Sequence, residues 1–235
     1  MIKHFLPVVL ACLLSASSWS QSDQGTLSVI PKAGISISTL NPTDRIYLGI
    51  SNDKASSGGS KYRSGFCAGA ELEYQFADRL SASVGAFFAN SGCKYGYAEA
   101  ETSKNEFSVL HDSYLSLGYI QMPLMLNCYV APNLAVKAGI QVGCLVTSTR
   151  HSEMQTYTVD PDTNVKTYGT NYVSDGSASN MQNRIDVSIP LGLSYEYEHM
   201  VLDARYNLGV RKIYKLAGDS KNRSVTVTIG YKFEL

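Results

Sequence analysis

The sequence predicts an all-β protein, an eight-stranded antiparallel up-and-down transmembrane β-barrel. Eight segments alternate apolar and polar residues, their connections alternate between short and long, and their charges fall on one parity. The segments exceed the about 9–11 residues that a tilted strand needs to cross the hydrocarbon layer. They cover residues 27–39, 63–76, 80–94, 113–130, 134–149, 183–197, 201–214 and 223–234.

The connections separate into two kinds. Residues 77–79, 131–133 and 198–200 form tight turns. The long connections are rich in Asn, Asp, Ser, Gly and Lys and cover residues 40–62, 95–112, 150–182 and 215–222. Outer-membrane barrels have short periplasmic turns and longer extracellular loops. The sequence therefore predicts loops outside the cell, both termini in the periplasm, and a first strand that pairs with the last, because hydrocarbon cannot solvate an open sheet edge.

Parity assigns the two faces of each strand. In 134–149, Val136 and Ile140 share one face, while Lys137 and Gln141 share the other. A charge on the lipid face at mid-bilayer costs about 2–4 kcal/mol, so the charged face should line the lumen. Because these charges are mixed in sign, we expect a salt-bridge network that fills the lumen. Its predicted members are Lys32, Glu71, Glu73, Lys137, Asp186, Glu196, Asp203, Arg205 and Arg211.

A soluble lipocalin-like barrel would show the same alternation with its faces reversed. Gly, Ser and Ala on the polar face suit a narrow lumen, and aromatics near the strand ends suit two membrane interfaces. The girdle predicted near the tight turns comprises Tyr74, Phe76, Tyr129, Tyr195, Tyr197, Tyr231 and Phe233. The girdle predicted near the loops comprises Phe88, Tyr95, Tyr114, Tyr206 and Tyr214.

The N-terminus is typical of an exported chain. Lys3 and His4 precede an apolar run over 5–14, and Ser18-Trp19-Ser20 places small residues for cleavage before Gln21. We therefore predict a signal peptide over 1–20 and an outer-membrane barrel domain over 21–235. Residues 9–12 loosely resemble a lipoprotein box, which stays an alternative.

Composition and motifs argue against several functions. Twenty basic and twenty acidic residues give no net charge to attract nucleic acid. His111-Asp112-Ser113 and His151-Ser152-Glu153 are sequence neighbours, whose side chains alternate between faces of a strand, so no catalytic residue is predicted. Asp160-Pro161-Asp162-Thr163-Asn164 lacks the Gly and Glu of a calcium loop and predicts a turn, with no metal or cofactor.

Two structural questions remain open at this stage. Cys67 and Cys93 share the polar parity on neighbouring strands but are offset by about three residues, so they form a disulfide only across a bulge. Cys128 and Cys144 lie on the lipid-facing parity, where we expect free thiols. Pro123 and Pro190 lie inside strands, where each removes a ladder donor and predicts a local distortion.

Several segments resemble the PorT-like outer-membrane β-barrel family. The segments 32–38 (KAGISIS) and 69–76 (GAELEYQF) resemble its first two strands, and 119–126 (YIQMPLML) resembles its most distinctive strand. Lys137-Ala138-Gly139 and the segment 204–209 continue the likeness, which extends over about residues 25–235. The resemblance implies a small eight-stranded barrel, and one branch of that family is linked to a protein-secretion system.

The expected function is that of a non-enzymatic, monomeric barrel in the outer membrane of a Gram-negative-type cell. It would present surface loops or assist envelope or secretion assembly, with membrane lipid and envelope or secretion-system proteins as partners. Tyr157, Tyr168 and Tyr172 in the longest loop suit adaptable contacts and form the candidate contact surface. A narrow channel for small solutes and a lipid-modifying enzyme are the alternatives.

Overall fold

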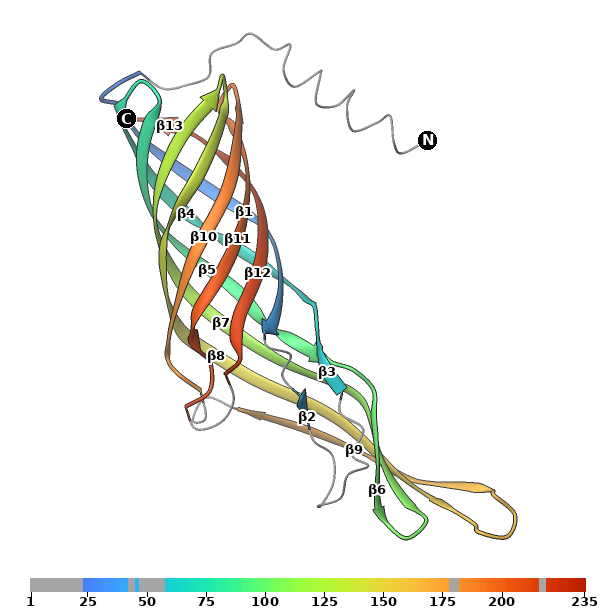
Figure 1. The fold of residues 1–235 in the computed structure, drawn as a ribbon. Helices are drawn as coiled ribbons and strands as arrows, with labels where there is room; N and C mark the ends of the chain where they lie inside the picture. Colours follow the sequence, from blue (N-terminus) through green and yellow to red (C-terminus); the bar gives the residue numbers. More distant parts are fainter. Residues whose placement is uncertain (1–22, 42–44, 47–57, 178–181, 216–218) are drawn as a thin grey trace, which may run out of the picture.

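The computed structural model describes residues 23–41, 45–46, 58–177, 182–215 and 219–235. The predicted signal peptide lies outside these residues. Eight strands pair in a closed antiparallel ring, as the sequence predicts (Figure 1). In order they are β1 (Leu27–Asn41), β4 (Arg63–Ala77), β5 (Leu80–Tyr95), β7 (Glu106–Ala131), β8 (Leu134–Val159), β10 (Ile185–Tyr197), β11 (Met200–Lys212) and β12 (Lys221–Tyr231).

The ring closes between the first and last of its strands. β1 pairs with β12 from Lys32↔Gly230 to Asn41↔Lys221, and its other edge pairs with β4. The two-residue strand β13 (Phe233–Glu234) extends this seam along β1. The closed ring gives the backbone N–H and C=O groups of the barrel wall partners inside the sheet, as a hydrocarbon environment requires.

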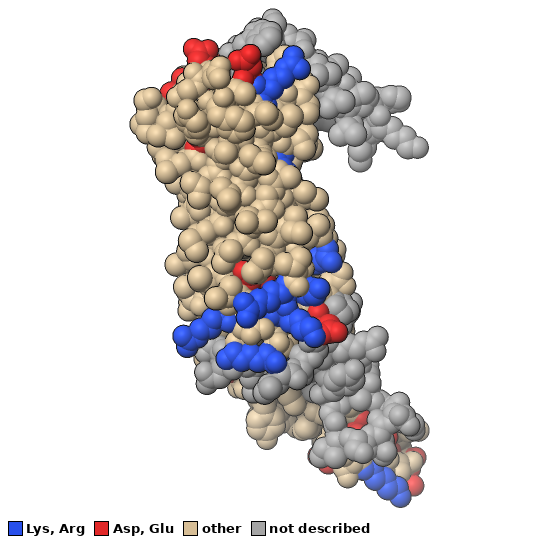
Figure 2. Space-filling model, turned by 60° about the vertical axis from the view of Figure 1, so that its left-hand side comes forward, with Lys and Arg blue, Asp and Glu red and all other residues tan. Residues whose placement is uncertain are grey.

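Apolar side chains face outward and charged ones face inward. Ile140 on β8 is 58% exposed and Leu191 on β10 is 46% exposed, whereas Lys137 on β8 is 2% exposed. Figure 2 shows the result as a broad surface band around the barrel with almost no charged side chains. The predicted parity is therefore confirmed, and its orientation is that of a membrane barrel, with the apolar face outside.

Two of the predicted loops contain strands, which corrects the sequence reading. Within 95–112 lies β6 (Ala98–Ser103), and within 150–182 lies β9 (Lys166–Ser177); β6 pairs with an elongated β7, and β9 with an elongated β8. These four strand segments form a ribbon beyond the barrel, called here the loop extension (Figure 1). Asn105 and Asn164 adopt positive φ at its turns, a conformation that Asn tolerates better than most residues. Two short strands, β2 (Arg45–Ile46) and β3 (Gly58–Lys61), lie within the first long connection.

Both strand prolines interrupt a ladder without shifting its register. The β5–β7 pairing stops after Val84↔Leu124 and resumes at Phe87↔Gln121, on either side of Pro123. The β8–β10 pairing is interrupted in the same way beside Pro190. The distortion predicted from proline chemistry is present as missing ladder pairs, with no extra residue inserted there. No helix long and apolar enough to cross a membrane occurs among the described residues.

Candidate functional site

A central ionic cluster fills the middle of the lumen. Five buried residues of the predicted network form it: Lys32, Glu71, Lys137, Asp203 and Arg205. Arg205 Nη2 donates to Glu71 Oε1 at 2.8 Å, and Lys137 Nζ donates to Asp203 Oδ2 at 3.0 Å. Lys32 contacts both carboxylates. Three cations thus surround two carboxylates, so each carboxylate holds several strands of the wall together.

A second cluster, called here the turn-end ionic cluster, lies closer to the tight turns. Lys232 Nζ is 3.0 Å from Glu73 Oε1 and 3.0 Å from Glu196 Oε2. Tyr129 donates to Glu196 at 2.7 Å and to Glu73 at 3.1 Å, and Asn127 donates to Glu73 at 3.0 Å. This cluster has an excess of one negative charge, which balances the excess of one positive charge in the central ionic cluster.

The turn-end ionic cluster includes residues that the sequence reading missed or misplaced. Lys232 was absent from the predicted network, although it lies on the polar parity of the last strand. Tyr129 was assigned to a lipid-facing girdle, but it is 3% exposed and lies inside the lumen. Its odd number shares the inward parity of Asn127 and Met125 on β7, and this signal could have placed it correctly.

Two predicted members do not join either ionic cluster. Asp186 is partly buried nearer the loops and accepts a hydrogen bond from Asn222 Nδ2 at 3.0 Å. Arg211 is exposed at the loop rim. Its parity is that of the lumen, but it lies at the end of β11, where the barrel opens.

An apolar plug closes the lumen at the loop end. It consists of buried Leu40, Cys93, Tyr95, Leu115, Leu117, Tyr119 and Ile213, with Leu145 and Tyr214 packed against it. Tyr95 and Tyr214 were predicted as lipid-facing, and the structure places them in this inner cluster instead. The sequence reading assumed that the inward face stays polar along its whole length, whereas buried apolar side chains are favourable wherever no lipid or water contacts them.

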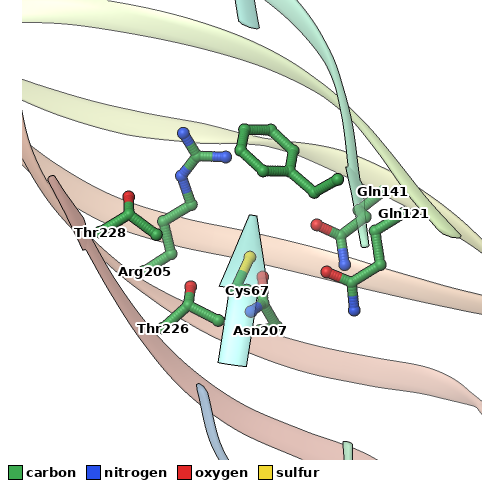
Figure 3. Close-up of a pocket in the computed structure, with 8 residues that line it drawn as sticks. Cys67, Gln121, Gln141, Arg205, Asn207, Thr226 and Thr228 are labelled. Atoms are coloured by element: carbon green, nitrogen blue, oxygen red, sulfur yellow. The ribbon is translucent and has the colours of Figure 1, made fainter. Parts of the chain in front are cut away.

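A small polar cavity separates the plug from the central ionic cluster. Figure 3 shows Arg205, Asn207, Gln121, Gln141, Cys67 and two threonines around it. Its free space is on the order of one water molecule. Cys67 pairs in register with Ala89, and both Cys67 and Cys93 are free thiols, so the bridge left open by the sequence is not formed. The lumen is therefore filled by side chains, as expected for eight strands.

The family follows from a comparison with known sequences. The model of the family described as "Outer membrane protein beta-barrel domain" matches residues 19–215. The chain belongs to this family. It is therefore an integral outer-membrane β-barrel protein.

Several solved barrels resemble this outer-membrane barrel at low sequence identity. Ail, the attachment invasion locus protein of Yersinia pestis, is 14% identical with a TM-score of 0.40, over 90% of this chain and all of Ail. OprG from Pseudomonas aeruginosa is 13% identical (TM-score 0.38; 91% of this chain, 98% of OprG). Neisserial surface protein A is 13% identical (TM-score 0.36; 88% of this chain, 97% of that protein). No protein with a curated description matches the chain.

The loop extension of the outer-membrane barrel carries the three predicted contact tyrosines. Tyr168 and Tyr172 on β9 are 60% and 63% exposed, as a contact surface requires. Tyr157 is only 4% exposed: its ring stacks on Phe107 with centroids 5.0 Å apart, and Lys166 Nζ lies 4.4 Å from its centroid. Tyr157 therefore holds the ribbon together, and only the other two tyrosines offer exposed rings.

Glu99 organises the side chains at the far end of the loop extension. It accepts hydrogen bonds from the hydroxyls of Tyr97 and Tyr157. These bonds hold the pKa of Glu99 below its ordinary value. They also raise the pKa of Tyr97 to about 12, because the hydroxyl proton is shared with a carboxylate. The ribbon is therefore a cross-linked structure with its own side-chain contacts.

The other motifs of the long loops have structural roles. Asp160 Oδ1 accepts hydrogen bonds from the backbone N–H groups of Asp162 and Thr163 at 2.9 and 3.0 Å, which is a turn and confirms the sequence reading. Among the described residues, no group of three or more His, Cys, Asp or Glu could hold a metal. Ser113 Oγ and Ser152 Oγ contact each other at 3.1 Å, and neither is bonded to a histidine ring.

His151 should make the pairing of β8 and β9 sensitive to pH. Its Nδ1 lies 2.6 Å from Asp175 Oδ1 on β9, and its Nε2 lies 3.6 Å from Glu153. The hydrogen bond to Asp175 is the main cause of a raised His151 pKa. A raised pKa contributes stability that is fully present below the ordinary value of about 6.5 and is lost as pH rises through the raised value.

We therefore expect amide exchange in β9 to accelerate as pH rises from about 6.5 through that raised value, beyond the intrinsic effect of pH. Asp175→Asn should lower the His151 midpoint in an NMR titration and remove the excess acceleration. His111→Gln is the matched control, because His111 contacts Gln155 and not a carboxylate. The same β9 exchange profile in wild type and Asp175→Asn would contradict this role.

Proposed function

We propose that this outer-membrane barrel is a non-enzymatic scaffold that presents its loop extension at the cell surface. The observation that carries the proposal is the contrast between a lumen filled by side chains and a structured ribbon beyond the barrel. The ionic clusters and the apolar plug suit anchoring and leave little room for transport. The ribbon has no role in membrane insertion, so we infer that it is the functional part.

The proposal includes an orientation and an export route. The tight turns lie at one rim and the loop extension at the other (Figure 1), and the usual arrangement of outer-membrane barrels places the longer loops outside. The predicted signal peptide over 1–20 would deliver the chain to the periplasm, with both termini left on that side. A cysteine at position 168 should react with an impermeant maleimide in intact cells if the loop extension is outside.

We further propose that the loop extension contacts another envelope protein. All twelve residues of β9 are exposed, including Tyr168, Tyr172 and Val173. A strand paired on one side only offers backbone groups to an added strand, and its side chains can then supply specificity. The resemblance of 119–126 to the PorT-like family makes a secretion or envelope-assembly component the partner to look for first.

Two experiments test the scaffold proposal. Purified protein in planar bilayers should give no steady conductance, because the plug and ionic clusters obstruct the lumen; a steady single-channel current would favour the narrow-channel alternative. A photo-crosslinker at position 168 or 172 should capture a discrete partner in intact cells, whereas position 140 on the membrane-facing band should not. Equal yields at 140 and 168 would contradict a contact surface on β9.

A further inference from the structure

Basic side chains gather at the loop end of the barrel. Six of them lie on the adjoining ends of β10, β11 and β12 or in the connections there. This basic rim patch comprises Arg184, Arg211, Lys212, Lys215, Lys221 and Arg223. Figure 2 shows Lys and Arg side chains grouped at this end of the molecule, directly beside the uncharged band.

The register places these residues close together. Lys212 and Lys221 are direct partners on β11 and β12, and Arg223 is the partner of Leu208 two positions further along β12. Asn183 donates its backbone N–H to Ile213, which brings Arg184 beside Lys212. The patch is therefore continuous across three strand ends.

Acidic side chains in the described part of this region do not neutralise the patch. Asp219 contacts Lys212, and Asp186 is bonded to Asn222. Like charges directly opposite each other destabilise a sheet, and one exposed carboxylate does not compensate the Lys212–Lys221 pair. In addition, no described residue accepts a hydrogen bond from the buried Nε of Arg223. The patch is thus organised as a set of donors without matching acceptors.

The two rims of the barrel differ in charge. Among the described residues, the tight-turn rim exposes Asp23, Asp78, Glu198 and Glu234 against Arg79. A general preference of basic residues for both membrane interfaces would place similar charges at both rims. The asymmetry therefore points to a ligand found only at the loop rim.

Apolar side chains of the membrane-facing band lie next to the patch. Val210 and Val225, 45% and 40% exposed, are on the same strands as Lys212 and Arg223. A ligand at this place meets acyl-chain surface on one side and guanidinium and ammonium groups on the other. Arginine and lysine at a membrane surface bind anionic lipid headgroups, and guanidinium donors match phosphate oxygens.

We propose that the basic rim patch binds the phosphate groups of the glycolipid in the leaflet around the loop rim. This inference rests on the proposed orientation, in which that leaflet is the outer one. Arg184, Lys221 and Arg223 bind phosphate oxygens at the rim, while the acyl chains pack against the apolar band below. The lipid thereby fixes the height and tilt of the barrel and so the position of the loop extension.

The test measures binding of lipid A to the purified full chain in neutral detergent by native mass spectrometry. Wild type should bind phosphorylated lipid A at least about tenfold more tightly than dephosphorylated lipid A with the same acyl chains, since each basic residue contributes separately. The triple variant Arg184→Gln, Lys221→Gln, Arg223→Gln should lose this preference. The matched control Lys61→Gln, Arg79→Gln, Lys104→Gln removes the same charge elsewhere and should keep it.

Two further arms separate the outcomes. Inorganic phosphate at the same concentration should not displace the lipid; displacement would indicate a site for soluble anions and overturn the proposal. Equal affinity for both lipids in wild type, or a retained preference in the correctly folded triple variant, would also overturn it. Heat-modifiable migration in gels checks the fold. Failure of the orientation itself would appear separately, as a position-168 cysteine that is unreactive in intact cells.

Discussion

Glu71→Gln should lower the free energy of unfolding by about 3–5 kcal/mol, the usual cost of removing one partner from a buried ion pair. Glu71 is 1% exposed and contacts Lys32, Lys137 and Arg205 from three other strands. The substitution keeps the shape of the side chain but leaves three buried cations facing Asp203 alone. Urea-induced unfolding of the barrel in lipid vesicles measures the change.

The matched control for this variant is Glu106→Gln in the loop extension. Glu106 is an exposed carboxylate on β7, so the same chemical change there should alter the stability by less than about 0.5 kcal/mol. Combining Glu71→Gln with Lys32→Met removes one of the stranded cations and should recover part of the loss. A Glu71→Gln barrel as stable as the Glu106→Gln barrel would show that the central ionic cluster does not hold the wall together.

Ile140→Arg should destabilise the folded barrel by about 2–4 kcal/mol, because it places a charge on the lipid face. Ile140 lies on β8 well inside the strand, and its side chain is 58% exposed. Val173 on β9 is 59% exposed, but it lies in the loop extension. The two positions are therefore equally accessible and differ only in what surrounds them.

Val173→Arg should leave the stability within about 0.5 kcal/mol of wild type, since the side chain there faces water. Both variants are measured by the same vesicle unfolding titration, and folding yield into vesicles gives a second readout. Equal effects at the two positions would mean that Ile140 and Val173 face the same solvent. That result would be incompatible with a membrane-facing band.

The eight barrel strands could be predicted because one physical cost operates along each of them. A charge facing lipid is expensive, so polar and apolar residues must alternate strictly over the whole crossing. Lys137 and Ile140 show this at opposite parities of one strand, and the structure confirms both. The closing β1–β12 pair could be predicted for a similar reason, because an open edge cannot persist in hydrocarbon.

The contents of the lumen were only partly predictable. Inward parity identified the central ionic cluster, but parity alone does not say which charges meet, and Arg211 lies at the open rim instead. Aromatic residues were assigned to girdles from their nearness to strand ends, which failed for Tyr129 and Tyr95. Inside the barrel no lipid constrains polarity, so apolar and polar residues are both tolerated, and packing with distant strands decides their place.

The loop extension was missed because nothing forces a sharp alternation outside the membrane. Ser, Thr, Asn and Gly in β9 are typical of loops, and this strand forms by pairing with β8 and not by burying a face of its own. The same freedom hid the burial of Tyr157, which depends on Phe107 from another strand. Pairing between segments far apart in the sequence is the information that local patterns lack.

Quenching of a single tryptophan by lipids brominated on their acyl chains tests the orientation of the wall most directly. Trp19 is the only tryptophan of the chain, so Trp19→Phe provides a background for Ile140→Trp and Val173→Trp. With the uncharged band in contact with acyl chains, fluorescence at position 140 should be strongly quenched and fluorescence at position 173 should be unaffected. Unquenched fluorescence at position 140 in the folded protein would contradict the membrane barrel.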